Sequence, residues 1–305
     1  MTQILYPSIT AVTGATGAQG GATARALLRG GHAVRALTRR PDSAAANEMR
    51  QWCAEVAYTD FAGPSSLEVA LAGATGLFAV TTPFETDVDT EVRDGITLLN
   101  AAAAGSIEHI VFTSAANADR TTGIPHFDSK YRIEQHLATL DLHWTVIAPA
   151  AFMDQFAEEW TLQGLRTGLF GRPMPAERPL ALIAVADIGA FAALVLTRPD
   201  EFVGRRIDIA SDERTGYEIA ALLGRGCRRE VTYQEFPIEY AEAHSPDLAA
   251  MFRYFATVGL DVDVAELRRD YPDVGWHSLP DWVGGRSWEG GGNRERRLRS
   301  PGRGE

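Results

Sequence analysis

The first half of this 305-residue chain alternates short apolar stretches with longer helical ones, and this alternation constrains the fold more than any other feature. Apolar, β-branched runs predict six strands, and segments with helical spacing lie between them. The six runs are 8–13, 32–38, 55–59, 77–81, 109–114 and 144–148. Strands that alternate with helices over short links pair in parallel, because each helix carries the chain back to the same edge. The pattern therefore predicts an α/β fold with a doubly wound parallel sheet.

The second half is less regular and predicts a different organisation. Residues 164–178 are rich in Gly, Pro and Arg and predict a loop or hairpin, whereas later segments read as scattered helices and strands. We expect a nucleotide-binding domain at 1–155 and a smaller C-terminal α/β lobe at 156–283 that returns in part to the first sheet. Residues 284–305 hold six arginines, three glutamates and two large apolar residues, a composition that predicts a disordered Arg- and Gly-rich tail.

Composition excludes several classes of protein. The net charge of −11 argues against nucleic acid as a partner of the folded body. The two cysteines, Cys53 and Cys227, form no CxxC pair, which argues against disulfide or thiolate–metal frameworks and fits a reduced, cytoplasmic setting. No window reaches the roughly 18 apolar residues of a membrane span, and we see no signal peptide. The seven histidines show no metal-binding spacing, so no metal is expected.

A glycine-rich turn separates the first strand from the first helix. The sequence GATGAQG places Gly14, Gly17 and Gly20 at GxxGxxG spacing. In such a turn the first glycine permits a tight bend, the second lets the backbone approach a pyrophosphate, and the third lets the helix pack on the strand. The helix N-terminus then offers amide donors to the phosphates. The context of strand, turn and helix predicts a dinucleotide site.

The end of the second strand indicates which dinucleotide. NAD sites place an acidic residue there to bond the ribose hydroxyls. Here the strand ends Thr38-Arg39-Arg40, and the first acid, Asp42, comes only after a proline. A 2′-phosphate requires cationic partners, and Arg39 is placed to supply one. The sequence thus favours NADP(H), with the alternative that both arginines only solvate the start of the next helix.

Several segments together resemble the NmrA-like family of atypical short-chain dehydrogenases/reductases. They are GATGAQG, TRRP, HFDSK followed by the strand TVIAP, and the later segments AVADIG and GRRIDIASDERT, so that the resemblance spans residues 8–285. It implies a Rossmann-type lobe, a small C-terminal lobe and a cleft over the nicotinamide. Some members of this family reduce quinones, ketones or related small molecules, and others bind NADP(H) as redox sensors or regulators.

The resemblance also implies roles for individual cofactor-binding residues. It assigns to the pyrophosphate Gly14, Thr16, Gly17, Gln19 and Gly20, to the adenosine phosphate Thr38 and Arg39, and to the adenine Asp60 and Phe61. The residues that it implies along the path to the nicotinamide are Thr81, Thr82 and Pro83. The residues that it implies to close over the nicotinamide are Pro149, Ala150 and Phe152.

The candidate catalytic residues centre on the single lysine of the chain. Of 29 basic side chains, 28 are arginine, and the exception is Lys130. The resemblance places Lys130 on the short-chain dehydrogenase lysine, whose ammonium bonds the nicotinamide ribose. The tyrosine that acts as proton donor four residues earlier is replaced by His126, which shares a helix face with Lys130. An imidazole can exchange a proton near neutral pH, and the hydroxyl of Ser114 could polarise a carbonyl. The alternatives are that His126 only walls the cleft, that Ser114 caps a strand, and that Lys130 is there by chance.

These observations predict an NADPH-dependent reductase of a ketone or quinone-type small molecule, with aromatic or secondary-metabolite compounds among the candidates. Apolar residues after the strand ends, such as Phe84, Phe152 and Phe156, line either a cleft for a flat ligand or the interface between lobes. The main alternative is a non-catalytic NADP(H)-binding redox sensor with a protein partner. A third class, a nucleic-acid binder acting through the tail, is disfavoured by the acidic body.

Overall fold

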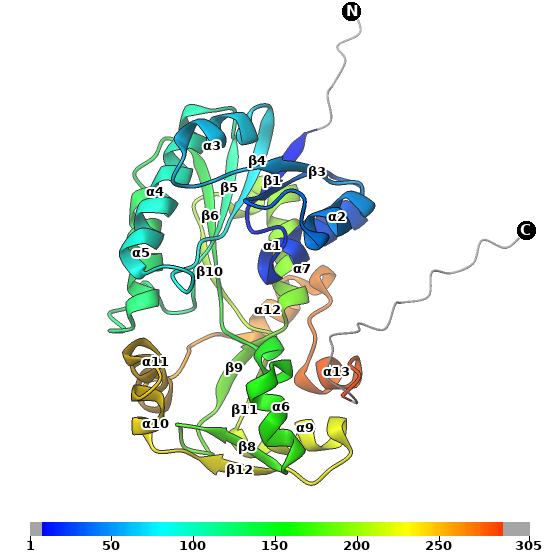
Figure 1. The fold of residues 1–305 in the computed structure, drawn as a ribbon, viewed down its shortest axis with the longest axis vertical. Helices are drawn as coiled ribbons and strands as arrows, with labels where there is room; N and C mark the ends of the chain where they lie inside the picture. Colours follow the sequence, from blue (N-terminus) through cyan, green and yellow to red (C-terminus); the bar gives the residue numbers. More distant parts are fainter. Residues whose placement is uncertain (1–7, 289–305) are drawn as a thin grey trace, which may run out of the picture.

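The computed structural model describes residues 8–288 and contains a seven-stranded, fully parallel sheet (Figure 1). The strands follow the order β10-β6-β5-β4-β1-β2-β3. Their bounds are β1 Ile9–Val12, β2 Ala33–Thr38, β3 Glu55–Tyr58, β4 Ala74–Ala79, β5 His109–Thr113, β6 His143–Pro149 and β10 Arg206–Ile209. The order reverses between β1 and β4, so the predicted doubly wound α/β fold is confirmed.

Helices cover both faces of this sheet. One face carries α1 (Ala18–Arg29), α2 (Ala44–Gln51) and α7 (Val185–Thr197), and the other carries α3 (Pro64–Leu71), α4 (Val88–Ala104) and α5 (Pro125–Leu137). The contact between α1 and α7 is close because Gly189 faces the Ala22 backbone, where a Cβ would lie 2.4 Å from a carbonyl carbon. The helix α7 comes from the second half of the chain, as does the edge strand β10.

The remaining elements form a smaller C-terminal lobe below the sheet in Figure 1. Its small sheets have the orders β11-β9-β7 and β12-β8. Its strands are β7 Ala151–Phe152, β8 Leu169–Arg172, β9 Leu180–Ile183, β11 Asp212–Arg214 and β12 Thr232–Glu235. Its helices, with those that link it to the main sheet, are η1 Met153–Ala157, α6 Glu159–Arg166, α8 Pro199–Phe202, α9 Gly216–Cys227, α10 Ile238–Glu242, α11 Pro246–Thr257, α12 Val264–Asp270, η2 Pro272–Val274 and α13 Leu279–Gly284.

Two boundaries differ from the sequence expectations. Residues 164–178 contain the end of α6 and the strand β8, which is ordered because β12 pairs with it in parallel from far along the chain. The predicted tail begins too early at 284, because Arg286 pairs with Asp154 at 2.5 Å and the Trp288 indole donates to the Val283 carbonyl at 2.9 Å. Residues 289–305 lie outside the described part of the chain.

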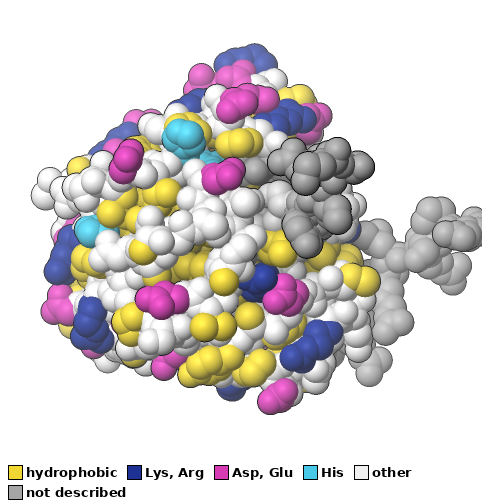
Figure 2. Space-filling model, turned by 90° about the horizontal axis from the view of Figure 1, so that it is seen from above, with side chains coloured by type: hydrophobic (Ala, Val, Ile, Leu, Met, Phe, Trp, Pro, Cys, Tyr) yellow, Lys and Arg dark blue, Asp and Glu magenta, His cyan; other side chains and the backbone are white. Residues whose placement is uncertain are grey.

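The described residues can be compared with what the composition predicted about membranes, cysteines, metals and surface charge. No helix within 8–288 is both long and apolar enough to cross a membrane. Neither cysteine is bonded, and no cluster of three metal-ligating side chains occurs in this range. On the face shown in Figure 2, acidic and basic side chains are interspersed rather than gathered by sign. That face therefore presents no continuous basic surface to a polyanion.

His277 ties the segment before α13 to the sheet-bound helix α7 and predicts a pH-dependent stability. Its Nδ1 lies 2.5 Å from Oδ1 of the buried Asp187, whose Oδ2 accepts the His277 amide at 2.9 Å. The hydrogen bond to Asp187 raises the pKa of His277 above 6.5, against an opposing effect of burial. Because the pKa of His277 is higher in the folded than in the unfolded protein, the pair stabilises the fold fully at a pH below the unfolded-state pKa. This stabilisation is lost as the pH rises through the folded-state pKa.

We therefore expect His277→Gln to lower the midpoint of thermal unfolding most near about pH 6, with a gap that narrows toward about pH 9. The control is His32→Gln, at an exposed position next to the α1 terminus. A gap that stays constant across this range would contradict the charged pair.

Candidate functional site

The glycine loop has the geometry of a phosphate cradle. Gly14 adopts a φ of +59°, and a Cβ there would lie 2.7 Å from Val80 Cγ1. A Cβ at Gly20 would lie 2.3 Å from the carbonyl oxygen of Thr13, so α1 can start this close to β1 only with glycine. Gly14, Thr16 and Gly17 are exposed, which leaves the loop backbone open to a ligand. The residues present thus fit a dinucleotide pyrophosphate.

Hydrogen bonds join this loop to the carboxyl ends of β4 and β5. Thr13 Oγ1 accepts the amide of Val80 at 2.8 Å, and the Gln19 side-chain oxygen accepts the Thr113 hydroxyl at 2.7 Å. Gln19 therefore fixes the loop against β5 through its side-chain oxygen. The loop, the segment after β4 and the end of β5 form one edge of the sheet, where ligands of doubly wound folds bind.

The residues predicted for the adenosine end lie along the neighbouring edge. Thr38 is buried, and its hydroxyl accepts the Arg40 amide at 3.1 Å. Arg39 is exposed and forms an ion pair with Glu85, from the segment after β4. Asp60 caps a turn through the Ala62 amide at 3.1 Å, and Phe61 packs on the core beneath α3. A 2′-phosphate at Arg39 would replace or join the Glu85 carboxylate.

The ammonium of Lys130 is buried and fully engaged. It lies 2.7 Å from Glu91 Oε1, 2.5 Å from the Thr81 carbonyl and 3.0 Å from the Thr81 hydroxyl. Burial lowers the pKa of Lys130, and the Glu91 carboxylate opposes this effect. These three acceptors match the three N–H donors of an ammonium. Through its two contacts with Thr81, Lys130 holds the segment after β4 in place. The bond from Lys130 to the nicotinamide ribose stays a prediction. It requires the ribose hydroxyl to replace one of these three acceptors.

Exposed and buried positions alternate in the segment that Lys130 supports. Thr81 and Pro83 are buried, whereas Thr82 and Phe84 are exposed. The Thr82 hydroxyl accepts a hydrogen bond from the Phe84 amide at 3.3 Å. Of the residues predicted to line the path to the nicotinamide, Thr82 presents its side chain to solvent.

Ser114 is also engaged by a buried carboxylate. Its hydroxyl donates to Glu134, which in turn accepts from Arg206 Nε at 2.9 Å. Burial raises the pKa of Glu134, although the Arg206 guanidinium opposes it. A hydroxyl that already donates to Glu134 has no second proton for a substrate carbonyl. The predicted role of Ser114 in polarising the substrate therefore stays a prediction that requires this contact to break.

His126 differs from both, because one ring nitrogen is left free. Its Nδ1 lies 2.8 and 2.9 Å from the two carboxylate oxygens of Asp247, the second residue of α11. Its ring contacts Phe84, with centroids 5.5 Å apart, and Phe127 at 4.8 Å. Among residues 8–288 no protein group is hydrogen-bonded to Nε2. His126 thus lies beside the segment after β4, with Nε2 available for a proton transfer.

The residues predicted to close over the nicotinamide lie at the junction of the two lobes. Pro149 and Ala150 are buried, and the Pro149 carbonyl accepts the Ala116 amide at 3.0 Å. Phe152 is partly buried against the core that includes Val12 and Ala15. Phe156 belongs instead to the core of the C-terminal lobe, so lobe packing accounts for it.

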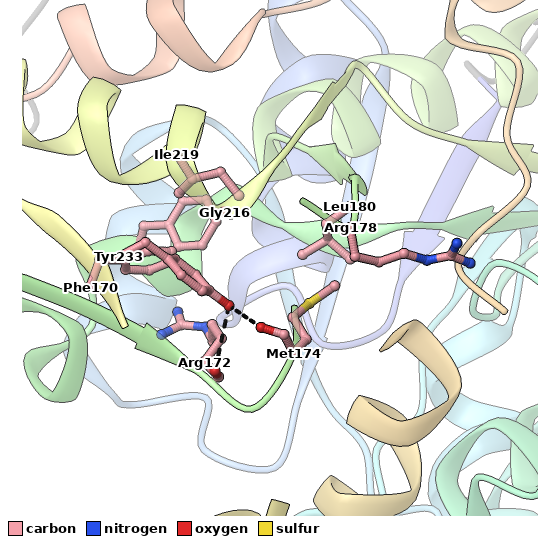
Figure 3. A pocket seen from close by; sticks show the side chains of 9 residues that line it. Phe170, Arg172, Met174, Arg178, Leu180, Gly216, Ile219 and Tyr233 are labelled. Atoms are coloured by element: carbon pink, nitrogen blue, oxygen red, sulfur yellow. Dashed lines mark hydrogen bonds between the residues drawn. The ribbon is translucent and has the colours of Figure 1, made fainter. Parts of the chain in front are cut away.

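A small apolar pocket occurs in the C-terminal lobe, away from the glycine loop (Figure 3). It encloses about 270 Å³ including its open mouth, between Phe170, Ile219 and Tyr233. The Tyr233 hydroxyl is taken by the Met174 carbonyl at 2.6 Å, and the Arg178 guanidinium extends away from it. The lining is mostly apolar, and its charged members are Arg172 and Arg178.

A doubly wound sheet with an open glycine cradle at its reversal point defines a Rossmann-type dinucleotide-binding protein. The chain belongs to the NmrA-like family, whose family model matches residues 8–274, and this confirms the resemblance seen in the sequence.

Individual relatives agree with this assignment. An NmrA-like family domain-containing oxidoreductase, FrzB from Cladobotryum sp, is 30% identical over 305 residues, covering 86% of this chain and 90% of its own. The NADPH-dependent quinone oxidoreductase QOR2 of Escherichia coli, complexed with NADPH, has a TM-score of 0.76 at 24% identity, covering 90% and 98%. NmrA, a negative transcriptional regulator in complex with NADP, has a TM-score of 0.76 at 20% identity, covering 91% and 94%. The two solved structures share the fold of this chain.

Proposed function

We propose that this protein is an NADPH-dependent reductase of a quinone or ketone-type small molecule. The observation that carries the proposal is the position of His126, whose free Nε2 lies beside the segment joined to the glycine cradle. Support comes from the family, which includes relatives named oxidoreductases, and from a quinone reductase of the same fold.

The residues of this chain divide the work by position. The backbone of Gly14–Gly17 and the start of α1 would hold the pyrophosphate, and Arg39 the 2′-phosphate. When bound, NADPH supplies the hydride. Lys130 keeps the segment after β4 in place through Thr81, and His126 gives the proton to the substrate oxygen.

The test is NADPH consumption against a panel of quinones and aromatic ketones, followed by absorbance. We expect turnover by the parent and a fall in kcat of about 100-fold in His126→Gln, because a positioned proton donor contributes about that much. The Kd for NADPH should not change. The matched control is His136→Gln on the same helix, since His136 is bonded to Asn100 away from this edge. Tight NADPH binding without consumption of any compound would refute the reductase.

A redox sensor is the second candidate, and the state of the expected catalytic residues favours it. The usual tyrosine is absent, and both Lys130 and Ser114 are held by buried carboxylates. NmrA, which shares the fold, is described as a transcriptional regulator. A sensor should bind NADPH and NADP⁺ with different affinity and recover a protein partner in one state only. Recovery of a partner that ignores the cofactor would count against it.

A further inference from the structure

The structure gives His126 a partner from the other lobe, and this pairing extends the proposed function. The Asp247 carboxylate reaches His126 Nδ1 with both oxygens, and its Oδ1 also lies 3.3 Å from the His126 amide. His126 is the second residue of α5, after Pro125, and Asp247 the second residue of α11, after Pro246. Two helix starts from different lobes therefore meet at this pair.

The pair is shielded enough to hold one geometry. The side chains are 15% and 23% exposed, and the rings of Phe84 and Phe127 flank the imidazole. Burial raises the pKa of Asp247, but the hydrogen bonds from His126 outweigh it and keep the pKa below its ordinary value. The carboxylate therefore stays ionised and acts as an acceptor only, which obliges Nδ1 to carry the hydrogen.

We propose that Asp247 is a positioning residue that fixes His126 with its hydrogen on Nδ1 and so presents Nε2 for proton transfer to the substrate oxygen. The proposal rests on the proposed reductase function. Bound NADPH would supply the hydride to the carbonyl carbon. The substrate oxygen would then hold the electron pair of the C=O π bond and take a proton from Nε2 of the doubly protonated His126 ring. Neutral His126 keeps its Nδ1–H bonded to Asp247, and solvent returns a proton to Nε2. The residue that orients the donor thus comes from the C-terminal lobe.

The experiment compares the parent with Asp247→Ala, His126→Gln and the double variant. We expect Asp247→Ala to lower kcat about 10- to 100-fold, with KM and the Kd for NADPH unchanged, because it disorders a proton donor and no binding group. In the His126→Gln background the same substitution should add nothing further, since the residue it orients is gone. The matched control is Asp261→Ala, which removes another ion pair between the lobes, at 3.3 Å to Arg120, and should keep parental kcat.

A second measurement does not depend on turnover. Nitrogen-15 spectra of the histidine rings, with the His126 signals identified by their loss in His126→Gln, report which ring nitrogen carries the hydrogen. When the ring is neutral, the parent should carry the His126 hydrogen on Nδ1, and Asp247→Ala should lose this preference.

The outcomes separate the two ideas. A parent that turns over while Asp247→Ala keeps parental kcat, or changes only KM, overturns the role of Asp247 and leaves the reductase standing. A parent without turnover refutes the reductase and the proton transfer, whereas the spectra still decide whether Asp247 fixes the ring. A neutral His126 ring in the parent that carries its hydrogen on Nε2, and not on Nδ1, overturns the positioning itself.

Discussion

Lys130→Met is expected to destabilise the protein by about 3–5 kcal/mol, the cost of leaving one partner of a buried ion pair alone. The side chain of Glu91 is fully buried, and its carboxylate is bonded to Lys130, Thr81 and Ser129. Without the ammonium, the buried Glu91 charge loses its cationic partner and keeps only the hydrogen bonds from two hydroxyl groups. Denaturant unfolding of the parent and the variant measures the difference.

The double variant Lys130→Met/Glu91→Met provides the control. It removes both charges, so most of the lost stability should return, because apolar residues can replace a buried pair at little cost. A single variant that unfolds within about 0.5 kcal/mol of the parent but loses NADPH affinity would instead support the ribose-binding role that the resemblance implies.

Gly20→Ala is expected to cost about 1–3 kcal/mol of stability and at least about tenfold in NADPH affinity. The added methyl group would meet two backbone oxygens, of Thr13 at 2.3 Å and of Gly14 at 2.4 Å, neither of which can rotate away. The start of α1 must shift, and the cradle shifts with it. Denaturant unfolding and NADPH titration give the two numbers.

Gly17→Ala separates packing from ligand approach. Gly17 is exposed with a φ of −104°, and its added Cβ would lie 3.3 Å from the Gly14 oxygen. We expect stability within about 1 kcal/mol of the parent but weaker NADPH binding, because the methyl group occupies the approach of the pyrophosphate. Gly63→Ala, where the nearest atom is 3.6 Å away, should change neither quantity. If Gly20→Ala and Gly17→Ala bound NADPH as tightly as the control Gly63→Ala, the dinucleotide would have to bind away from the glycine turn.

Local sequence patterns predicted the main sheet well, because parallel strands buried on both faces leave continuous apolar runs such as Ile110–Phe112. The pairing of β8 with β12 was not visible, since it joins Leu169 to Thr232 and no local pattern specifies so distant a partner. The same limit applied to the end of the folded chain, where Trp288 is held by Trp282.

Glu91 and Asp247, the acidic partners of Lys130 and His126, were not identified from the sequence, although one of the two had a recognisable signal. Glu91 had a signal, because it stands on the apolar stripe of α4 with Val92 and Leu98, where a charge needs a buried partner. Asp247 had none, since an acid at a helix start is ordinary and only the tertiary fold brings it to His126. The sequence therefore predicted the glycine turn and singled out His126, but it did not show which buried groups contact Lys130, Ser114 and His126.

Because α7 and β10 come from the second half of the chain and pack in the first lobe, neither lobe can be removed or exchanged without changing the other. A fragment ending at residue 155 would leave the edge of β6 unpaired and the α7-facing side of α1 bare, because β10 and α7 cover them. Exchanging the C-terminal lobe for that of a relative would likewise replace part of the nucleotide-binding sheet. Changes in substrate preference in this chain are therefore better sought by single substitutions around His126 than by swapping lobes.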